Sequence, residues 1–113
     1  LMFMEICKIY DCKMLEIDVI GCSGPVFVEL WAAWCGQGRM VGPGVEELSN
    51  VYDGDVRFVN VNVDEAKELV SNYNFFSIPT LMIFNKGKVV TQQVGAASKD
   101  AYKNMIDRAL ENL

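Results

Sequence analysis

The feature that most constrains the fold is a run of apolar residues at positions 26–32 that contains a single acid, Glu29. A strand whose side chains are apolar on both faces must be covered on both faces, and a sheet achieves this when helices pack on either side of it. A turn signal, Cys-Ser-Gly-Pro at 22–25, precedes the run. The sequence therefore predicts a buried central strand in a layered α/β domain, with one acid in its interior.

Length and charge limit the remaining choices. The 113 residues suffice for one domain, 1–113, with its own hydrophobic core. The net charge is −5 and the basic residues are scattered, so we expect no nucleic-acid partner. No run of 18 apolar residues occurs and residues 1–6 do not resemble a secretory signal, so we expect no membrane segment and a cytoplasmic location.

The chain contains no histidine. This absence excludes Ser-His-Asp and Cys-His hydrolytic sites, Cys2His2 zinc fingers and a haem held by histidine. The four cysteines do not form a Cys-x-x-Cys pair or a zinc-ribbon spacing, and in a cytosolic chain we expect them to be reduced. We therefore expect neither a metal nor a cofactor. The cysteines are Cys7, Cys12, Cys22 and Cys35.

Hydrophobic periodicity predicts four further strands besides the central run. Residues 5–10 alternate loosely, and residues 56–63 are rich in β-branched side chains. Residues 80–84 and 88–94 flank Asn-Lys-Gly, a glycine-containing turn that indicates an antiparallel hairpin.

Four helical segments are expected between and after these strands, at 11–21, 39–52, 64–73 and 98–113. The second contains Gly-Pro-Gly at 42–44, which should bend it, since a proline inside a helix removes a backbone hydrogen bond. The last segment carries apolar residues at helical spacing from Tyr102 to Leu113. The expected N-caps are Asp11, Asp64 and Ser98.

Residues 31–40, Trp-Ala-Ala-Trp-Cys-Gly-Gln-Gly-Arg-Met, closely resemble the active-site stretch of thioredoxins. Glu29 stands where that family has a buried aspartate, and Ile-Pro-Thr at 78–80 stands where it has its cis-proline loop. Val-Gly-Ala at 94–96 resembles its last substrate-facing loop. These landmarks occur in family order over essentially the whole chain. The resemblance implies the thioredoxin fold, an α/β fold with a central mixed β-sheet flanked by helices on both faces.

One departure from the family determines the functional interpretation. The family motif is Trp-Cys-Gly-Pro-Cys, and residues 34–38 here are Trp-Cys-Gly-Gln-Gly. Cys35 is therefore present, whereas Gly38 replaces the thiol that would resolve a mixed disulfide. The resemblance implies a thiol-disulfide oxidoreductase of redox homeostasis with one active thiol. It would form mixed disulfides with protein or low-molecular-weight thiol partners and depend on glutathione or a thioredoxin reductase.

Two alternatives remain open at this point. The chain could be a non-catalytic thioredoxin-fold module that binds extended or partly folded clients. It could also be a thioredoxin whose resolving cysteine was removed, so that it traps clients instead of turning them over.

The resemblance assigns roles residue by residue. Cys35 and Glu29 are the candidate catalytic residues, while Trp31 and Pro43 are structural, the first packing beneath the loop and the second kinking the helix. Phe76 is either an exposed client contact or a core residue. The expected client surface consists of Trp34, Gly36, Gln37, Phe76, Ile78, Pro79, Gly95 and Ala96.

Glu29 and the other three cysteines carry separate expectations. The apolar neighbours of Glu29 predict a buried carboxyl with a raised pKa, and Asn60 stands where the family has a compensating lysine. The alternative is an ordinary charge on an edge strand. Cys7, Cys12 and Cys22 are expected to be small core residues, with a regulatory or intermolecular disulfide as the alternative.

Overall fold

The computed structural model describes residues 7–32, 34, 36–74 and 77–113, and for residues 7 and 36–43 it describes the backbone alone. Its strands are β1 (Cys7–Lys8), β2 (Pro25–Trp31), β3 (Arg57–Asn62), β4 (Thr80–Asn85) and β5 (Lys88–Val94). Its helices are α1 (Cys12–Leu15), which continues into the π-helical turn Glu16–Ile20, α2 (Gly36–Val51), α3 (Lys67–Tyr73) and α4 (Lys99–Glu111).

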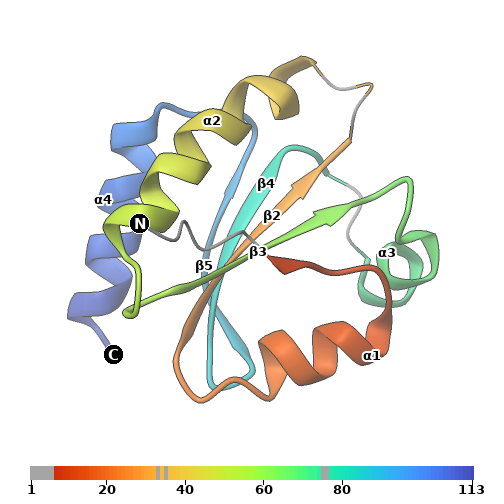
Figure 1. The fold of residues 1–113 in the computed structure, drawn as a ribbon, viewed down its shortest axis with the longest axis horizontal. Helices are drawn as coiled ribbons and strands as arrows, with labels where there is room; N and C mark the ends of the chain where they lie inside the picture. The colour runs from red at the N-terminus through yellow and green to blue at the C-terminus, as the bar shows by residue number, and fades with distance from the viewer. Residues whose placement is uncertain (1–6, 33, 35, 75–76) are drawn as a thin grey trace.

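The five strands form one mixed sheet in the order β1-β3-β2-β4-β5. Strands β1, β3 and β2 are parallel, β4 is antiparallel to β2, and β5 is antiparallel to β4. Helices α2 and α4 cover one face of this sheet, and α1 and α3 cover the other (Figure 1). The α/β architecture, with helices on both faces of a central mixed sheet, is confirmed.

Strand β2 occupies the centre of the sheet and its five middle residues are buried. Its alternate side chains enter two separate cores. Val26, Val28 and Leu30 contribute to the core beneath α1 and α3. Phe27 packs into the core beneath α2 and α4, where its ring stacks on Phe58 with the ring centroids 4.8 Å apart. The prediction of a strand buried on both faces is confirmed.

The hairpin between β4 and β5 has the predicted turn. Asn85 pairs with Lys88, so the two residues of the turn are Lys86 and Gly87, and both have positive φ angles, 52° and 81°. Positive φ at both central residues gives the twist that joins antiparallel strands most easily. Glycine at the second position carries no steric cost in this conformation.

Three expectations about helix ends are wrong. Helix α2 begins at Gly36, three residues earlier than predicted, and continues without a break through Gly-Pro-Gly at 42–44. Burial of Val45 and Leu48 against the sheet outweighs the low helix propensity of that segment. Whether the axis bends there stays a prediction. Helix α4 ends at Glu111, which leaves Leu113 exposed instead of packed in the stripe.

The third wrong expectation concerns Asp64, which does not cap α3. The N-cap of α3 is Ala66, which makes no side-chain cap hydrogen bond. The side chain of Asn62 instead accepts a hydrogen bond from the backbone N–H of Asp64 at 3.0 Å, and the carbonyl of Asn62 accepts those of Glu65 and Ala66. These bonds form a turn that uses up residues 64 and 65 before the helix begins.

The N-cap of α4 is the predicted one, and it gives a direct test of the fold. The Ser98 side chain accepts a hydrogen bond from the Ala101 N–H at 3.1 Å. We expect Ser98→Ala to lower the free energy of unfolding by about 1 kcal/mol, because one amide of the first turn loses its acceptor. Urea unfolding followed by tryptophan fluorescence measures this. Ser71→Ala, an exposed position within α3, is the matched control, and an equal loss in both variants would contradict the capping role.

Candidate functional site

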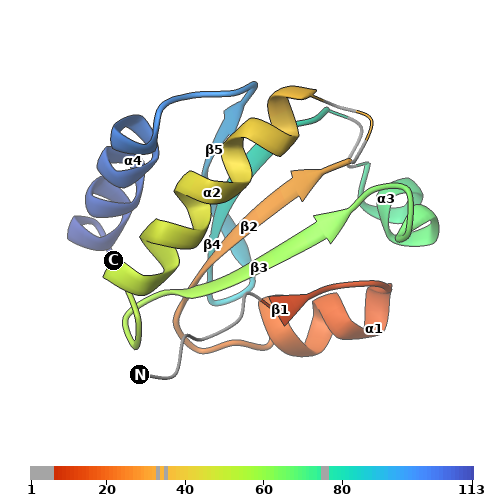
Figure 2. The ribbon, with the colours of Figure 1, turned by 45° about the horizontal axis from the view of Figure 1, so that its top comes forward.

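The candidate site lies at the end of the sheet where β2 stops. Thr80, the first residue of β4, pairs with Leu30 near the end of β2 and with Val94 at the end of β5. The start of α2 lies toward the same end of the sheet (Figure 2). The antiparallel direction of β4 therefore brings the loop before β4 and the loop after β5 close to the segment that joins β2 to α2.

The loop before β4 contains the Ile78–Pro79 peptide bond, which is cis. Pro79 is buried and Ile78 is half-buried. The carbonyl of Pro79 accepts a hydrogen bond from the Gly95 N–H at 2.8 Å, and Ala96 next to it is exposed. This bond holds two of the predicted client loops side by side.

Trp34 is the described side chain that most plainly offers an apolar surface here, with 68% of its area exposed. Gly36, Gln37, Gly38 and Pro43 lie in α2, where the backbone is described. Cys35 and Phe76 lie outside the described residues. Their predicted roles therefore stay predictions, and both interpretations of Phe76 stay open.

The Trp31 side chain is hydrogen-bonded to the neighbouring strand β3. It is half-buried, and its indole Nε1 donates a hydrogen bond to Oδ1 of Asn60 at 3.3 Å. Asn60 is also the residue that pairs with Glu29 across β2 and β3. Asn60 therefore holds the indole, and its position is the one that carries the lysine in the family resemblance.

Glu29 lies in the middle of β2, with only 5% of its surface exposed. Its place in the central strand rules out the alternative of a charge on an edge strand. It alternates with Val28 and Leu30, so its side chain shares the face of Phe27 and points toward the core beneath α2 and α4. Among the described residues, its Oε2 has no hydrogen-bond partner.

This environment raises the pKa of Glu29 from its ordinary value of 4.5 to about 7. The main cause is burial, which penalises the carboxylate more than the neutral acid, and the negative charge of Glu46 on α2 adds to it. The direction agrees with the expectation from the sequence. A carboxyl with a pKa near 7 can give or accept a proton at neutral pH.

Two of the other cysteines lie on the opposite face of the sheet from the Glu29 side chain. Cys12 and Cys22 are free thiols, half-buried against the core beneath α1 and α3. The sulfur of Cys12 accepts a hydrogen bond from Nδ2 of Asn72 at 3.3 Å. Both therefore pack at the border of this core without being fully buried in it, while the Cys7 side chain lies outside the described part of the chain.

Sequence reasoning missed the role of Tyr102. It placed this residue in the apolar stripe of α4, where the ring indeed packs, but its hydroxyl accepts a hydrogen bond from the Ala97 N–H at 2.8 Å. The available signal was a tyrosine among otherwise apolar residues, since a buried hydroxyl requires a partner.

Among the residues that the structure describes, no group of three His, Cys, Asp or Glu residues could hold a metal ion. Within the same ranges, no helix is long and apolar enough to cross a bilayer.

The buried carboxyl of Glu29 makes a pH-dependent prediction. Between about pH 4.5 and 7 the folded protein keeps the Glu29 proton and the unfolded chain loses it, so the free energy of unfolding falls as the pH rises through this window. A shift from 4.5 to about 7 corresponds to roughly 3 kcal/mol above pH 7. We therefore compare the free energy of unfolding of Glu29→Gln with that of wild type at two pH values. We expect the difference, variant minus wild type, to be larger at pH 8 than at pH 4.5 by up to about 3 kcal/mol.

Urea unfolding of both proteins at several pH values measures this difference. Glu68→Gln is the control, because it removes one exposed acid on α3, on the other face of the sheet, and leaves the Glu29 carboxyl and its surroundings in place. A difference between wild type and Glu29→Gln that does not change with pH would contradict an elevated pKa.

Comparison with known proteins identifies the family. The thioredoxin family pattern matches residues 8–108. Thioredoxin 1 of Synechococcus elongatus is 45% identical over 93 residues, which cover 82% of this chain and 87% of that protein. Thioredoxin of Synechocystis sp. is 44% identical over 103 residues, covering 91% and 95%. Thioredoxin of Chlorobaculum thiosulfatiphilum is 38% identical over 95 residues, covering 84% and 88%. The chain belongs to the thioredoxin family, whose general activity is thiol-disulfide exchange with protein substrates.

Proposed function

We propose that this protein exchanges disulfides through one active thiol, Cys35. The observation that carries the proposal is the sequence Trp-Cys-Gly-Gln-Gly at 34–38, with a thiol just before the first residue of α2 and no thiol at Gly38. Unpaired N–H groups and the dipole at a helix N-terminus favour a thiolate. We expect the pKa of Cys35 to be lowered less than in a two-thiol site, because Gly38 cannot donate a hydrogen bond to the sulfur.

In the proposed reaction, the Cys35 thiolate attacks one sulfur of a client disulfide. A new sulfur–sulfur bond forms to Cys35, the client bond breaks, and the second client sulfur leaves with the electron pair as a thiolate. A second thiolate must then attack the mixed disulfide to release Cys35. With Gly38 in place of a cysteine, we propose that glutathione or another external thiol performs this step, with a thioredoxin reductase as the alternative reductant.

Glu29 enters this proposal as the candidate proton carrier. The family residue at this position serves the resolving thiol, which Gly38 lacks, so here the proton would pass to or from the external thiol or the leaving client sulfur. The Glu29 pKa of about 7 supports the role, because the carboxyl is close to half-ionised at neutral pH. Its position on the face that α2 covers also supports it. The cytoplasm, where external thiols keep cysteines reduced, is the location that suits such a reaction.

A second candidate function is client binding without chemistry. The exposed Trp34 and the paired loops at Pro79 and Gly95 favour it, since this surface needs no thiol. Such a module would bind clients equally well after Cys35→Ala. A third candidate, a thioredoxin that lost its resolving cysteine, would accumulate clients as mixed disulfides that glutathione does not release.

The first measurement is the pH dependence of Cys35 alkylation by iodoacetamide, with each cysteine quantified by peptide mass spectrometry. We expect a midpoint below the value of about 8.5 of a free thiol, because the helix N-terminus stabilises the thiolate. Cys12 and Cys22 are internal controls on the far side of the sheet. A Cys35 midpoint at or above 8.5 would leave client binding as the function.

The loss of the resolving thiol gives a second prediction. We expect Gly38→Cys to release a peptide from Cys35 on the order of tenfold or more faster than wild type with glutathione, because the second attack becomes intramolecular. The decay of a preformed Cys35–peptide disulfide measures release, and Gly38→Ser is the control that adds a similar side chain without a thiol. Equal release from the cysteine and serine variants would contradict the assignment of position 38.

A further inference from the structure

The loop after β5 is short, and hydrogen bonds to described residues hold its backbone at Gly95 and Ala97. Gly95 has a φ angle of 88°, a conformation that gives the chain a sharp turn and that side-chain-bearing residues rarely adopt. Its N–H donates to the Pro79 carbonyl at 2.8 Å, which ties the loop to the loop before β4. The exposed Ala96 follows, and Ala97 then leads into α4.

The second hydrogen bond that holds this loop is made by a buried side chain, that of Tyr102. The hydroxyl of Tyr102 accepts a hydrogen bond from the Ala97 N–H at 2.8 Å and lies 3.5 Å from the Gly95 carbonyl oxygen, at the limit of a hydrogen bond. Only 1% of Tyr102 is exposed, and its ring packs in the core beneath α2 and α4. A rigid, buried ring therefore places a hydroxyl directly against the backbone on both sides of Ala96.

We propose that Tyr102 is a positioning residue for peptide clients, because its hydroxyl fixes the loop Gly95–Ala97 against Pro79 in the form that an extended peptide contacts. This inference rests on the proposed function and deepens it, since it assigns the selection of extended peptide disulfides over small disulfides to a residue beneath the client surface. A small disulfide needs only the sulfur of Cys35. An extended peptide also needs ordered backbone beside that sulfur.

The hydroxyl stays neutral in this role. Burial raises the pKa of Tyr102 above its ordinary value, the hydrogen bond from Ala97 lowers it, and the nearby charge of Glu29 raises it. Replacing the hydroxyl with hydrogen, as in Tyr102→Phe, keeps the ring in the core and leaves the half-buried Ala97 N–H without its acceptor. Among the described residues, the loop is then held by the hydrogen bond between Gly95 and Pro79.

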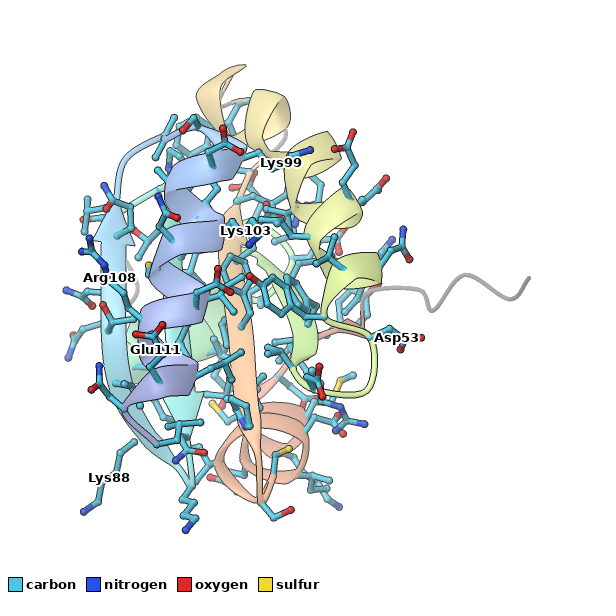
Figure 3. The ribbon with its side chains drawn as sticks, turned by 90° about the vertical axis from the view of Figure 1, so that its left-hand side faces the viewer. Asp53, Lys88, Lys99, Lys103, Arg108 and Glu111 are labelled. Atoms are coloured by element: carbon cyan, nitrogen blue, oxygen red, sulfur yellow. The ribbon has the colours of Figure 1, made fainter. Side chains whose placement is uncertain are left out.

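Helix α4 is held in place independently of this hydroxyl. The hydroxyl of Tyr52, in the turn just after α2, hydrogen-bonds to Asp107 on α4, and Lys99 on α4 pairs with Glu47 on α2 at 2.6 Å. Figure 3 shows Lys99 and Lys103 on the side of α4 that faces α2. We therefore expect Tyr102→Phe to loosen the loop and leave the position of α4 unchanged.

The test compares two probes with the same leaving group. One is an extended ten-residue peptide whose single cysteine forms a disulfide with 5-thio-2-nitrobenzoate, and the other is the same disulfide of 2-mercaptoethanol. The Cys35 thiolate attacks the peptide or mercaptoethanol sulfur, the probe disulfide breaks, and thionitrobenzoate leaves with the electron pair. Absorbance follows its release, and mass spectrometry assigns the modified sulfur to Cys35 rather than to another cysteine.

We expect Tyr102→Phe to lower the second-order rate with the peptide probe about fivefold relative to wild type, the factor that one lost hydrogen bond gives. The rate with the mercaptoethanol probe should stay within about twofold, because the loop plays no part in that reaction. Tyr52→Phe is the matched control, since it removes a tyrosine hydroxyl that also bonds to α4 but lies away from the loop. Tyr52→Phe should leave the rate with the peptide probe and the rate with the mercaptoethanol probe unchanged relative to wild type.

Three results would overturn the inference: no effect on the peptide rate, equal effects on both probes, or a similar loss of peptide selectivity in Tyr52→Phe. A wild type that reacts with neither probe would instead contradict the proposed chemistry. In that case, the affinity for the peptide with serine in place of cysteine, followed through the amide NMR signals of Gly95 and Ala97, still tests Tyr102. About fivefold weaker binding by Tyr102→Phe supports the role, and equal binding overturns it.

Discussion

Burial of β2 on both faces is the constraint on which the rest of the structure depends. Two layers of helices are needed to cover it, α1 and α3 on one face and α2 and α4 on the other. Its neighbours run in opposite directions, since β3 is parallel and β4 antiparallel to it. The start of β4 therefore lies at the end of β2, and the loops before β4 and after β5 lie at the end of the sheet toward which α2 begins.

The same burial accounts for the unusual state of Glu29. A carboxyl in a central strand loses its hydration. The side-chain amide oxygen of Asn60, its neighbour on β3, accepts the hydrogen bond of the Trp31 indole. The described neighbours include no cation that shifts its pKa, whereas Glu46 raises it. An acid held in this way opposes folding at neutral pH, as the proton-transfer role proposed for Glu29 would lead one to expect.

Much of the fold could be predicted from local pattern. The apolar run gave the central strand, Asn-Lys-Gly gave the hairpin turn, and Ser98 gave the start of α4, because each depends on a few adjacent residues. The errors arose where distant contacts decide. Packing of Val45 and Leu48 extended α2 through glycine and proline, and Asn62 displaced Asp64 as the organiser of the turn before α3. The partner of the Tyr102 hydroxyl is set by the path of a loop, which periodicity does not describe.

The pairing of Thr80 with both Leu30 and Val94 has a consequence for the order of events during synthesis. Cys35, the thiol of the proposed reaction, belongs to the first third of the chain, whereas both loops that would select its clients belong to the last third. A nascent chain that has emerged only as far as α3 has the thiol but lacks β4 and β5, so it has no surface with which to choose a partner. Under the proposed function, client selectivity would therefore arise only after the C-terminal hairpin has joined the sheet and α4 has packed on it.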